Sequence, residues 1–514
     1  MTRPATLALA PGTAPATPGT GANTAPAPLF ALDGALSRAG DGYFDWLDHV
    51  WAAAGCTHPV RLHGDIHTID THTGEILHTN STEAMPDGVI YKPCGNRRTA
   101  VCPSCAETYR RDAYHLIRAG LIGGKTVPEA VTHHPAVFAT FTAPSFGDVH
   151  TRHIRRHTCT NRADCTCRPE PCHARRTPQS CPHGYTLACF TRHTTDDPQL
   201  GQPLCPDCYD YSHQAVWNAH TGELWRRTKQ AIERHLNHHS RALGLPRIRV
   251  SHGKVAEYQA RGAIHFHALL RLDGIDPDNL DAVIPPPAGL TVADLDDAIH
   301  HAAGHVVFTT PPHPDQLDGW PITWGEQLDV RTIGGIGTDP MTDAMVAAYL
   351  AKYATKSTEI TGHTSRRIDA TTINHYANPT GTHTQRLIHA CWKIGEHPDY
   401  QRLRRWAHML GYGGHFLTKA RRYSLTFAKL RAARITYRRT QTTGPEHTPI
   451  TDHDDTASDE TTTIITQLTY AGTGWKNTGD ALLANTAADL ACRRRQTARE
   501  ETQPHSQSAT QQAA

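Results

Sequence analysis

The chain has 514 residues, and its 38% hydrophobic content is enough for a substantial buried core, in roughly two or three domains. Its formal net charge of +2 excludes a uniformly basic nucleic-acid-binding protein, so a DNA-binding surface requires an uneven distribution of charge. Aromatic residues make up 7% of the chain, which argues against a coat protein that binds single strands mainly by stacking.

The N-terminal segment has the composition of a disordered tail, which we predict to cover residues 1–40. Residues 1–28 are mostly Ala, Pro, Thr and Gly, which cannot bury enough apolar surface to offset the entropy of ordering. The short apolar run after Arg3 is interrupted by Pro11 and lacks a good cleavage context for a signal peptide. No run approaches the ~18 apolar residues that a membrane span needs. The sequence therefore predicts a soluble, cytoplasmic protein with no membrane partner.

Fourteen cysteines, two Cys-x-x-Cys pairs and no secretion signal favour metal binding over disulfides. In the region 41–135, a tight pair and two distal thiolates can close one structural Zn²⁺ site: Cys56, Cys94, Cys102 and Cys105. An insertion at 157–210 holds more candidates than one zinc requires, including Cys159, Cys165, Cys167, Cys172, His173, His183 and His193. From this insertion we predict a second zinc site made by Cys181, Cys189, Cys205 and Cys208. The alternative is a set of reduced surface thiols.

The middle of the chain contains helical and strand patterns in a defined order. The sequence predicts a strand at 136–142, a helix at 214–243, a hairpin at 248–272, a helix at 291–305, a strand at 326–333 and a helix at 342–355. The order β-α-β-β-α-β followed by a helix is the split βαβ arrangement, an antiparallel sheet with helices on one face. We therefore predict an α+β fold with this palm as a domain at 136–360. The last helix would lie across the exposed sheet face.

The hairpin at 248–272 is the stretch around which the predicted domain is built. A three-residue hairpin loop commonly ends in a residue with positive φ, a conformation that suits Gly262. In this register Glu257 faces His265, and His265 and His267 project from the same side of their strand. The three side chains can hold a divalent ion that takes further oxygen ligands, such as Mg²⁺ or Mn²⁺. With 37 histidines, about 2.7 His-x-His pairs are expected by chance, so the pair alone proves nothing.

The segment YLAKYATK, residues 349–356, lies in the last helix of the predicted palm. Residues four apart share a helix face, so Tyr349 and Tyr353 point the same way. Lys352 and Lys356 form an adjacent cationic edge, suited to DNA phosphates. Taken alone, the segment is more simply explained as two half-buried aromatic residues on an Ala-rich helix.

Residues 361–439 form a basic region that we predict to be helical and to bind DNA. From residue 382 to residue 439, 13 Lys and Arg residues stand against two acidic residues. Arg421 and Arg422 are candidate phosphate contacts, and the alternative is a solvated helix face. The remaining segments are an acidic linker at 440–461, a small strand-and-helix element at 462–498 and a disordered tail at 499–514.

Together, the hairpin and the tyrosine segment resemble the HUH endonucleases, which nick single-stranded DNA through a tyrosine. The resemblance is closest to rolling-circle replication initiators of actinomycete plasmids and integrative elements, and it extends from about Gly55 to Arg439. VFATFTAPSFG at 137–147 is similar to the family's first motif, EYQARGAIHFHAL to the second and YLAKYATK to the third. The combination is specific, although each motif alone is weak.

The resemblance implies a plasmid replication initiator that nicks single-stranded or supercoiled origin DNA. Tyr353 would attack the DNA with a divalent cation held by Glu257, His265 and His267. The products would be a 5′-phosphotyrosine and a free 3′-hydroxyl that primes a host DNA polymerase. Tyr349 would serve a later strand-transfer step. The sequence has no GxxxxGK[ST] phosphate loop, so strand separation would need a host helicase.

Two other functions remain open from the sequence. One is a conjugative relaxase or a transposase with the same chemistry, although relaxases usually carry a third histidine where this chain has Glu257. The other is a non-enzymatic, zinc-dependent DNA-binding protein, in which His265 and His267 are ordinary sheet residues. The formation of protein-linked 5′ ends on origin DNA separates these classes.

Overall fold

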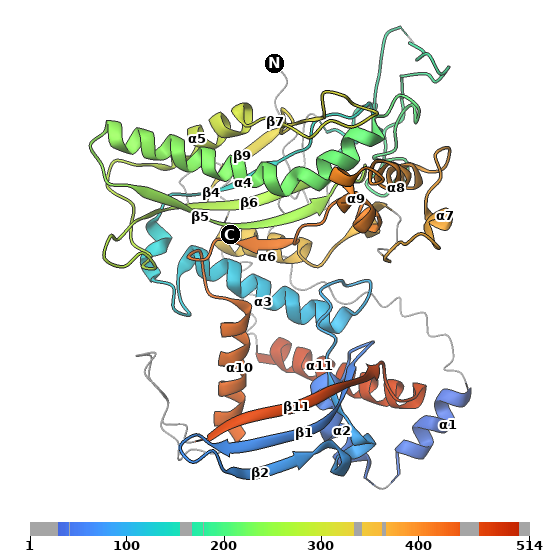
Figure 1. Cartoon of the computed structure of the whole chain (residues 1–514), viewed down its shortest axis with the longest axis vertical. Coiled ribbons are helices and arrows are strands. Elements are labelled where there is room, and N and C mark those ends of the chain that lie inside the picture. Colours follow the sequence, from blue (N-terminus) through green and yellow to red (C-terminus); the bar gives the residue numbers. More distant parts are fainter. Residues whose placement is uncertain are drawn as a thin grey trace, which may run out of the picture. The chain divides into compact units, whose positions relative to one another are not determined.

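The computed structural model describes residues 29–40, 42–154, 167–177, 179–333, 342–361, 366–442 and 462–502 (Figure 1). Within these residues the chain divides into two compact units, and two helices continue from one unit into the other. The larger unit runs from Arg110 to Arg438, and the smaller unit joins the residues before Arg110 to those after Arg438. None of the helices in the described ranges combines the length and the apolarity that crossing a bilayer requires.

The larger unit is built on a five-stranded antiparallel sheet in the order β10-β5-β6-β4-β9. Its strands are β4 (Ala136–Phe141), β5 (Ile248–Tyr258), β6 (Ile264–Gly274), β9 (Leu328–Thr332) and β10 (Leu417–Lys419). Helices α4 (Tyr211–Ala242) and α5 (Val292–His305) cover one face, and α6 (Asp343–Tyr353) lies on the other (Figure 1). The mixed α+β class predicted from the sequence is confirmed.

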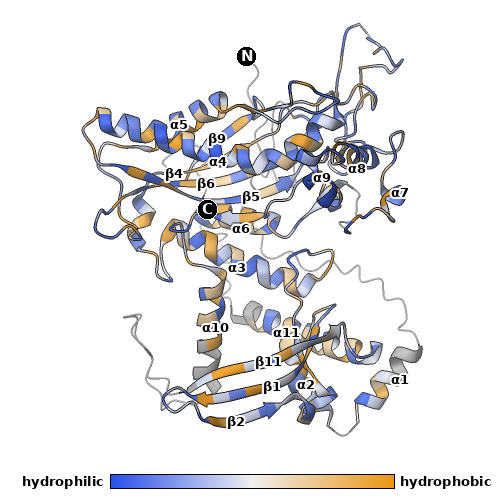
Figure 2. Ribbon diagram, viewed as in Figure 1, coloured by the Kyte–Doolittle hydropathy of each residue, from blue (hydrophilic) through white to orange (hydrophobic). Residues whose placement is uncertain are grey.

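Burial of one apolar sheet face explains why two helices cover it. Ile264, Phe266, Ala268 and Leu270 alternate along β6 and are fully buried in a core shared with α4 side chains such as Trp217. Apolar and polar residues are interspersed along α4 and α5, as expected for helices with one buried face (Figure 2). Both helices also start at side-chain caps, Asp210 for α4 and the capping box of Thr291 for α5.

The hairpin has the register that the sequence predicts. The Gln259 amide donates to the Ala263 carbonyl at 2.9 Å, which closes a three-residue loop, and Gly262 has φ 74°. Glu257 is therefore paired with His265 across β5 and β6. A Cβ added at Gly262 would also lie 2.9 Å from a methyl group of Leu410, so both conformation and space favour glycine there.

The basic region differs from the predicted all-helical segment. It contains α7 (Ile373–Tyr376), α8 (His383–Ile394), α9 (Arg402–Arg405) and α10 (Phe427–Thr442), and also strand β10. Strand β10 extends the five-stranded sheet by pairing with the edge of β5, with Thr418 opposite Lys254. Covering this edge satisfies backbone groups of β5 that would otherwise need water. A short two-stranded ribbon, β7 (Phe308–Thr309) and β8 (Pro321–Ile322), lies outside this sheet.

The smaller unit joins segments far apart in sequence. Strand β1 (Val60–Asp70) pairs with β2 (Ile76–Ser81), β3 (Ile90–Lys92) and β11 (Thr462–Thr473). Its helices are α1 (Leu29–Arg38), α2 (Tyr43–Val50), the beginning of α3 (Pro103–Ile122) and α11 (Thr478–Thr502). The predicted 462–498 element is thus not separate, because β11 completes this sheet and Ala484 joins its core.

The structure corrects the predicted ends of the terminal tails. Helix α1 lies within the tail predicted at 1–40, and Arg38 at its end forms ion pairs with Asp87 and Asp480. Helix α11 continues to Thr502, beyond the predicted start of the C-terminal tail. Residues 1–28, 443–461 and 503–514 lie outside the described residues, as do Cys159 and Cys165 of the insertion.

Candidate active site and metal-binding groups

Glu257, His265 and His267 converge on the face of the palm sheet that α4 and α5 leave uncovered. The Nε2 atoms of both histidines lie 3.0 Å from the same carboxylate oxygen of Glu257. His265 and His267 are buried, and the Glu257 side chain is 11% exposed. Single ligand atoms of the three residues lie within 4.8 Å of one another, so they can share one cation.

The protonation states at this group suit metal binding. Burial alone would raise the pKa of Glu257, but its hydrogen bonds to His265 and His267 outweigh burial and lower the pKa to about 2. Burial and the neighbouring His265 lower the pKa of His267 to about 4. At neutral pH the carboxylate is therefore charged and the His267 imidazole neutral, the forms that bind a cation.

Two side chains outside the predicted set support His267. The hydroxyl of Thr140 on β4 lies 3.1 Å from His267 Nδ1, which leaves Nε2 free to face Glu257. The ring of Phe138 stacks on the imidazole at 5.8 Å between centroids. Both residues follow from the strand register, because Thr140 pairs with His267 and Phe138 shares its face.

Helix α6 brings both candidate tyrosines to the same group. The Tyr349 hydroxyl lies 3.2 Å from His267 Nε2, and the ring of Tyr353 lies 5.9 Å from the His267 ring. The two tyrosine rings are 4.5 Å apart, as expected for residues one helical turn apart. Thr342 caps the start of the helix by accepting from the Met345 amide, which fixes where the turns begin.

Burial makes the two tyrosines unequal. It raises the pKa of Tyr353 to about 12, with a further contribution from the Glu257 carboxylate. The pKa of Tyr349, which is more deeply buried and also hydrogen-bonds Tyr353, is raised further. The ammonium groups of Lys352 and Lys356 lie 5.7 Å and 4.7 Å from the centre of the Tyr353 ring. The pKa of Tyr353 is thus raised less than that of Tyr349, because Tyr353 is less deeply buried and its hydrogen bond with Tyr349 lowers its pKa.

Arg331 on β9 is a cation at this site that the sequence analysis did not single out. Its Nε donates to Asp329 at 3.0 Å, but its Nη2 is buried without a hydrogen-bond partner. Its positive charge makes a small contribution that lowers the pKa of Tyr349, against the larger effect of burial. The register could have identified it, because Arg331 pairs with Phe138 and so shares the site's sheet face.

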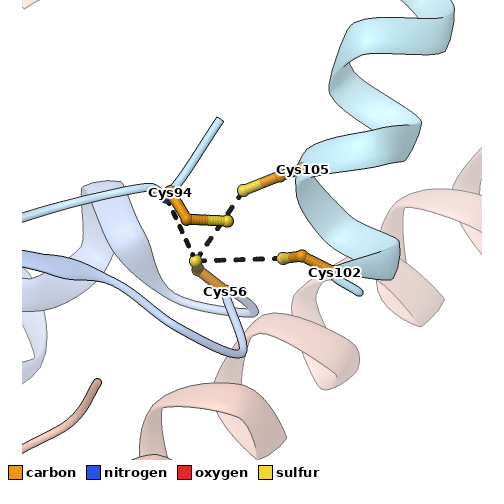
Figure 3. A group of neighbouring side chains, drawn as sticks. All are labelled: Cys56, Cys94, Cys102 and Cys105. Atoms are coloured by element: carbon orange, nitrogen blue, oxygen red, sulfur yellow. Dashed lines mark hydrogen bonds between the residues drawn. The ribbon is translucent and has the colours of Figure 1, made fainter. Parts of the chain in front are cut away.

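The first predicted cysteine group is brought together as expected. Cys56, Cys94, Cys102 and Cys105 surround one point at the beginning of α3 (Figure 3). The sulfur of Cys56 lies 3.8 Å from that of Cys102 and 3.7 Å from that of Cys105. A tetrahedral zinc with Zn–S bonds near 2.3 Å has edges of about 3.8 Å, so the spacing fits zinc.

The predicted second group is wrong in one member. Cys181, Cys205 and Cys208 lie together, but their fourth neighbour is His183, whose Nδ1 is 3.7 Å from the Cys205 sulfur. Cys189 lies elsewhere, because it forms an antiparallel bridge with His173. The spacing of the cysteines in the sequence does not reveal that Cys189 pairs with His173.

Cys189 belongs to a third group that the sequence analysis did not predict, with His150, Cys172 and His193. The Cys189 sulfur lies 3.6 Å from His193 Nε2, and the Cys172 sulfur lies 3.8 Å from His150 Nδ1. His193 Nδ1 faces a carboxylate oxygen of Asp197 at 2.7 Å, the arrangement that orients many metal-bound histidines. No disulfide occurs among the cysteines in the described ranges.

Sequence comparison identifies the family. A family model described as "Replication initiator protein, pSAM2" matches residues 42–489. The chain is also 41% identical over 469 residues to a replication initiator protein of Streptomyces ambofaciens, covering 89% of this chain and 92% of that relative. The chain belongs to this family of replication initiators. No solved structure matches it.

A replication initiator binds DNA, and the candidate DNA contacts of this initiator are more constrained than the sequence suggested. Arg421 and Arg422 lie in the turn after β10 and both pair with Asp281, at 3.2 and 2.9 Å. Four more of the 13 basic residues also have carboxylate partners, namely Arg386, Lys393, Arg404 and Arg434. Three of these four carboxylates lie outside residues 382–439. Counting the charges within that segment alone therefore overlooks them.

Proposed function

We propose that the initiator starts rolling-circle replication by nicking one strand of its origin through a tyrosine of α6. One observation carries this proposal: both tyrosines lie beside Glu257, His265 and His267, and the Tyr349 hydroxyl is 3.2 Å from His267 Nε2. A metal-ligand group and a pair of nucleophiles therefore share one buried sheet face. The likeness to HUH endonucleases, with the palm as the nuclease domain, gives the same function.

The donor set fits an octahedral divalent ion. Octahedral metal–ligand bonds of about 2.1 Å place neighbouring ligands about 3.0 Å apart, the distance from the Glu257 oxygen to both Nε2 atoms. Glu257, His265 and His267 would hold Mg²⁺ or Mn²⁺, which prefers further oxygen ligands such as those of water and phosphate. When bound, the ion supplies charge that polarises the phosphodiester and stabilises the transition state.

The chain's own residues perform the transfer. The Tyr353 oxygen forms a bond to phosphorus as the bond from phosphorus to the 3′ oxygen breaks. The phenolic proton passes to water and the departing 3′ oxygen takes a proton from water, so the products are a 5′-phosphotyrosine and a 3′-hydroxyl. Lys352 and Lys356 offset the charge of the phosphate beside Tyr353. A host helicase and a host polymerase would then separate and extend the strands.

The assignment of Tyr353 as the first nucleophile rests on its easier ionisation and its two lysines. Tyr349 lies closer to the metal ligands, but its deeper burial raises the cost of its phenolate. We therefore assign Tyr349 to the later strand transfer that reseals the displaced strand.

We further infer that the three cysteine-containing groups hold structural Zn²⁺ and take no part in the chemistry. Each offers four sulfur or imidazole ligands, the donor set of closed structural sites, with no position open for substrate. The insertion that carries two of them has few regular elements, so metal would supply much of its folding energy.

A nicking assay tests the proposal. Full-length protein, supercoiled origin DNA and Mg²⁺ or Mn²⁺ should yield nicked circles with protein on the 5′ end. Glu257→Ala and His267→Ala should abolish nicking, whereas His300→Ala, which alters an exposed histidine of α5, should not. Full activity of the two ligand variants would refute the metal group.

The alternatives predict other outcomes in the same assay. Origin binding without any cleavage would favour the non-enzymatic DNA-binding function. Cleavage at a transfer origin or at transposon ends, and not at a replication origin, would favour a relaxase or a transposase.

A further inference from the structure

A cavity of about 680 Å³ lies between α4, β5 and the turn after β10 in the larger unit. Six cationic side chains line it against a single carboxylate, that of Glu233; they are Arg226, Lys229, Arg249, Lys254, Arg421 and Arg422. Ligand-binding cavities commonly have volumes of about 300–1,000 Å³, so this cavity can hold a ligand of nucleotide size.

The cavity is separate from the candidate active site. Lys254 and Glu257 are three residues apart on β5, so their side chains project from opposite faces of the sheet. Lys254 stands on the face covered by α4, beside Phe266, whereas Glu257 stands on the face of α6. A ligand in this cavity would not contact the metal ligands or the tyrosines.

Most cations around the cavity already have partners. Lys229 pairs with Glu233 at 2.6 Å and Arg226 with Glu223 at 2.6 Å. Arg421 and Arg422 share Asp281, as described above. Each of these four cations therefore has a carboxylate partner within the protein, although Arg421 and Arg422 share one.

Lys254 is the exception. It is 4% exposed and lines the cavity, and within the described part of the chain no protein group forms a hydrogen bond or an ion pair with its ammonium group. The group lies 3.5 Å from the ring centre of Phe266 and 5.6 Å from that of Trp225. A buried ammonium ion without a hydrogen-bond acceptor is costly, and an aromatic face compensates only in part.

Two side chains next to Lys254 in the cavity also have polar atoms without a hydrogen-bond partner. The Nδ1 of His252 and the Nε of Arg249 are buried and have no hydrogen-bond partner. Burial and three surrounding lysines, Lys229, Lys254 and Lys419, lower the pKa of His252 to about 3. Burial likewise lowers the pKa of Lys254 to about 7. At neutral pH His252 is therefore neutral and Lys254 only partly charged, so the floor of the cavity offers polar atoms without partners and an amine whose protonation an anion would favour.

We propose that this cavity binds a phosphate group, held by the Lys254 ammonium and flanked by Arg249 and His252. A phosphate carries up to two negative charges and several acceptor oxygens, and it would satisfy donors that the protein leaves unpaired. The phosphate could belong to a free nucleotide or to a DNA strand passing over the rim. The site does not depend on the nicking chemistry.

Calorimetric titration of the full-length protein with inorganic phosphate and with dAMP tests the proposal. Both should bind, and Lys254→Met should weaken each by at least about tenfold, the value of one charged hydrogen bond. Lys125→Met, which removes the same charge from an exposed turn, should bind as the unaltered protein does. Absence of binding, or equal binding by Lys254→Met, would overturn the site.

A short single-stranded oligonucleotide without origin sequence distinguishes the sources of phosphate. If it displaces dAMP in a Lys254-dependent manner, the site takes a strand phosphate; if dAMP stays bound, the site takes a free nucleotide. Should Lys254→Met fail to fold, the ¹³Cε resonance of Lys254 in the unaltered protein provides the test. Phosphate should raise its titration midpoint, and an unchanged midpoint would contradict the proposal.

Discussion

At the scale of single residues, the candidate metal ligands and the candidate nucleophiles differ in their protonation at neutral pH. Glu257 and His267 are in their metal-binding forms at neutral pH, whereas both tyrosines ionise only far above it. In the proposed reaction, nearby positive charge would therefore have to stabilise the phenolate, either a bound cation or a side chain such as Lys356. The same reasoning gives Arg331 a role, because a cation with an unused Nη2 beside Tyr349 can hold a phosphate oxygen.

Replacing Arg331 with Met should slow formation of the covalent adduct by roughly 10- to 100-fold, the value of a lost charge-assisted hydrogen bond. Manganese affinity, measured by electron paramagnetic resonance, should stay unchanged because Arg331 is not a ligand. Arg331→Lys should recover part of the rate in single-turnover assays. An unaltered rate in Arg331→Met would remove this residue from the site.

A second residue-scale prediction concerns stability. Asp273 is fully buried and accepts from Arg271 at 2.7 Å, from Ser251 at 2.6 Å and interacts with His134 at 2.8 Å. Asp273→Asn leaves the Arg271 charge buried without its partner and should cost about 3–5 kcal/mol of unfolding free energy. Urea titration measures the unfolding free energy of each variant. The control Glu396→Gln should lose at most about 1 kcal/mol, because its partner Arg404 is part-exposed.

The pH dependence of this effect has a defined sign. Burial opposes the Asp273 charge, but hydrogen bonds from His134, Arg271 and Ser251 outweigh burial and lower its pKa. Its contribution is therefore complete above the unfolded value of about 3.9 and is lost as the pH falls below that value. The difference between the two proteins should shrink below about pH 4, and a difference that grows there would contradict the assignment.

At the scale of elements, local signals explain what the sequence predicted well. The β5–β6 hairpin was predictable because strand alternation and Gly262 lie within one short stretch, and its register determines where Glu257 and the histidines meet. Helix α6 was likewise predictable from its own periodicity. Strand β10 was not, because three residues in a basic segment carry no period, and its pairing depends on the edge of a strand more than 150 residues earlier.

The residues of the metal-binding groups were also hard to predict from the sequence. Which cysteines and histidines meet depends on the path of an insertion that has few regular helices or strands. We predict three zinc ions per chain by elemental analysis. Cys172→Ser and Cys189→Ser should each lose the same single ion, so their combination should retain two. Cys492→Ser, which alters an exposed cysteine outside the three groups, should retain three. Loss of a single ion from a Cys181→Ser, Cys189→Ser double variant would restore the grouping expected from the sequence.

At the scale of the whole molecule, a net charge of +2 conceals both basic surfaces and the carboxylates that neutralise them. Arg421 and Arg422 can contact DNA only by leaving Asp281 or by sharing it. The pairing of β1 with β11 could not be predicted from the sequence either. It joins residues about 400 positions apart, and no short sequence pattern indicates it.

Because Arg421 and Arg422 pair with Asp281, we expect substitutions of the arginines and of the aspartate to change DNA affinity in opposite directions. Arg421→Ala with Arg422→Ala should weaken DNA binding and flatten its salt dependence by ~0.7–0.9 logarithmic units per lost phosphate contact. Asp281→Asn should strengthen binding, because it frees both arginines. Fluorescence anisotropy across a salt series measures both, and an unchanged slope in the double variant would show that these arginines do not contact phosphate.

We propose that Tyr353 becomes linked to the 5′ phosphate of the nicked origin strand. Lys352 lies between the two tyrosines, so trypsin separates Tyr349 and Tyr353 into different peptides, and mass spectrometry can assign the nucleotide to one of them. We predict a metal-dependent adduct on the peptide YATK, lost in Tyr353→Phe and retained in Tyr349→Phe. An adduct on the Tyr349 peptide alone would reverse the two roles. Nicking by the double variant, or nicks without linked protein, would contradict the tyrosine mechanism.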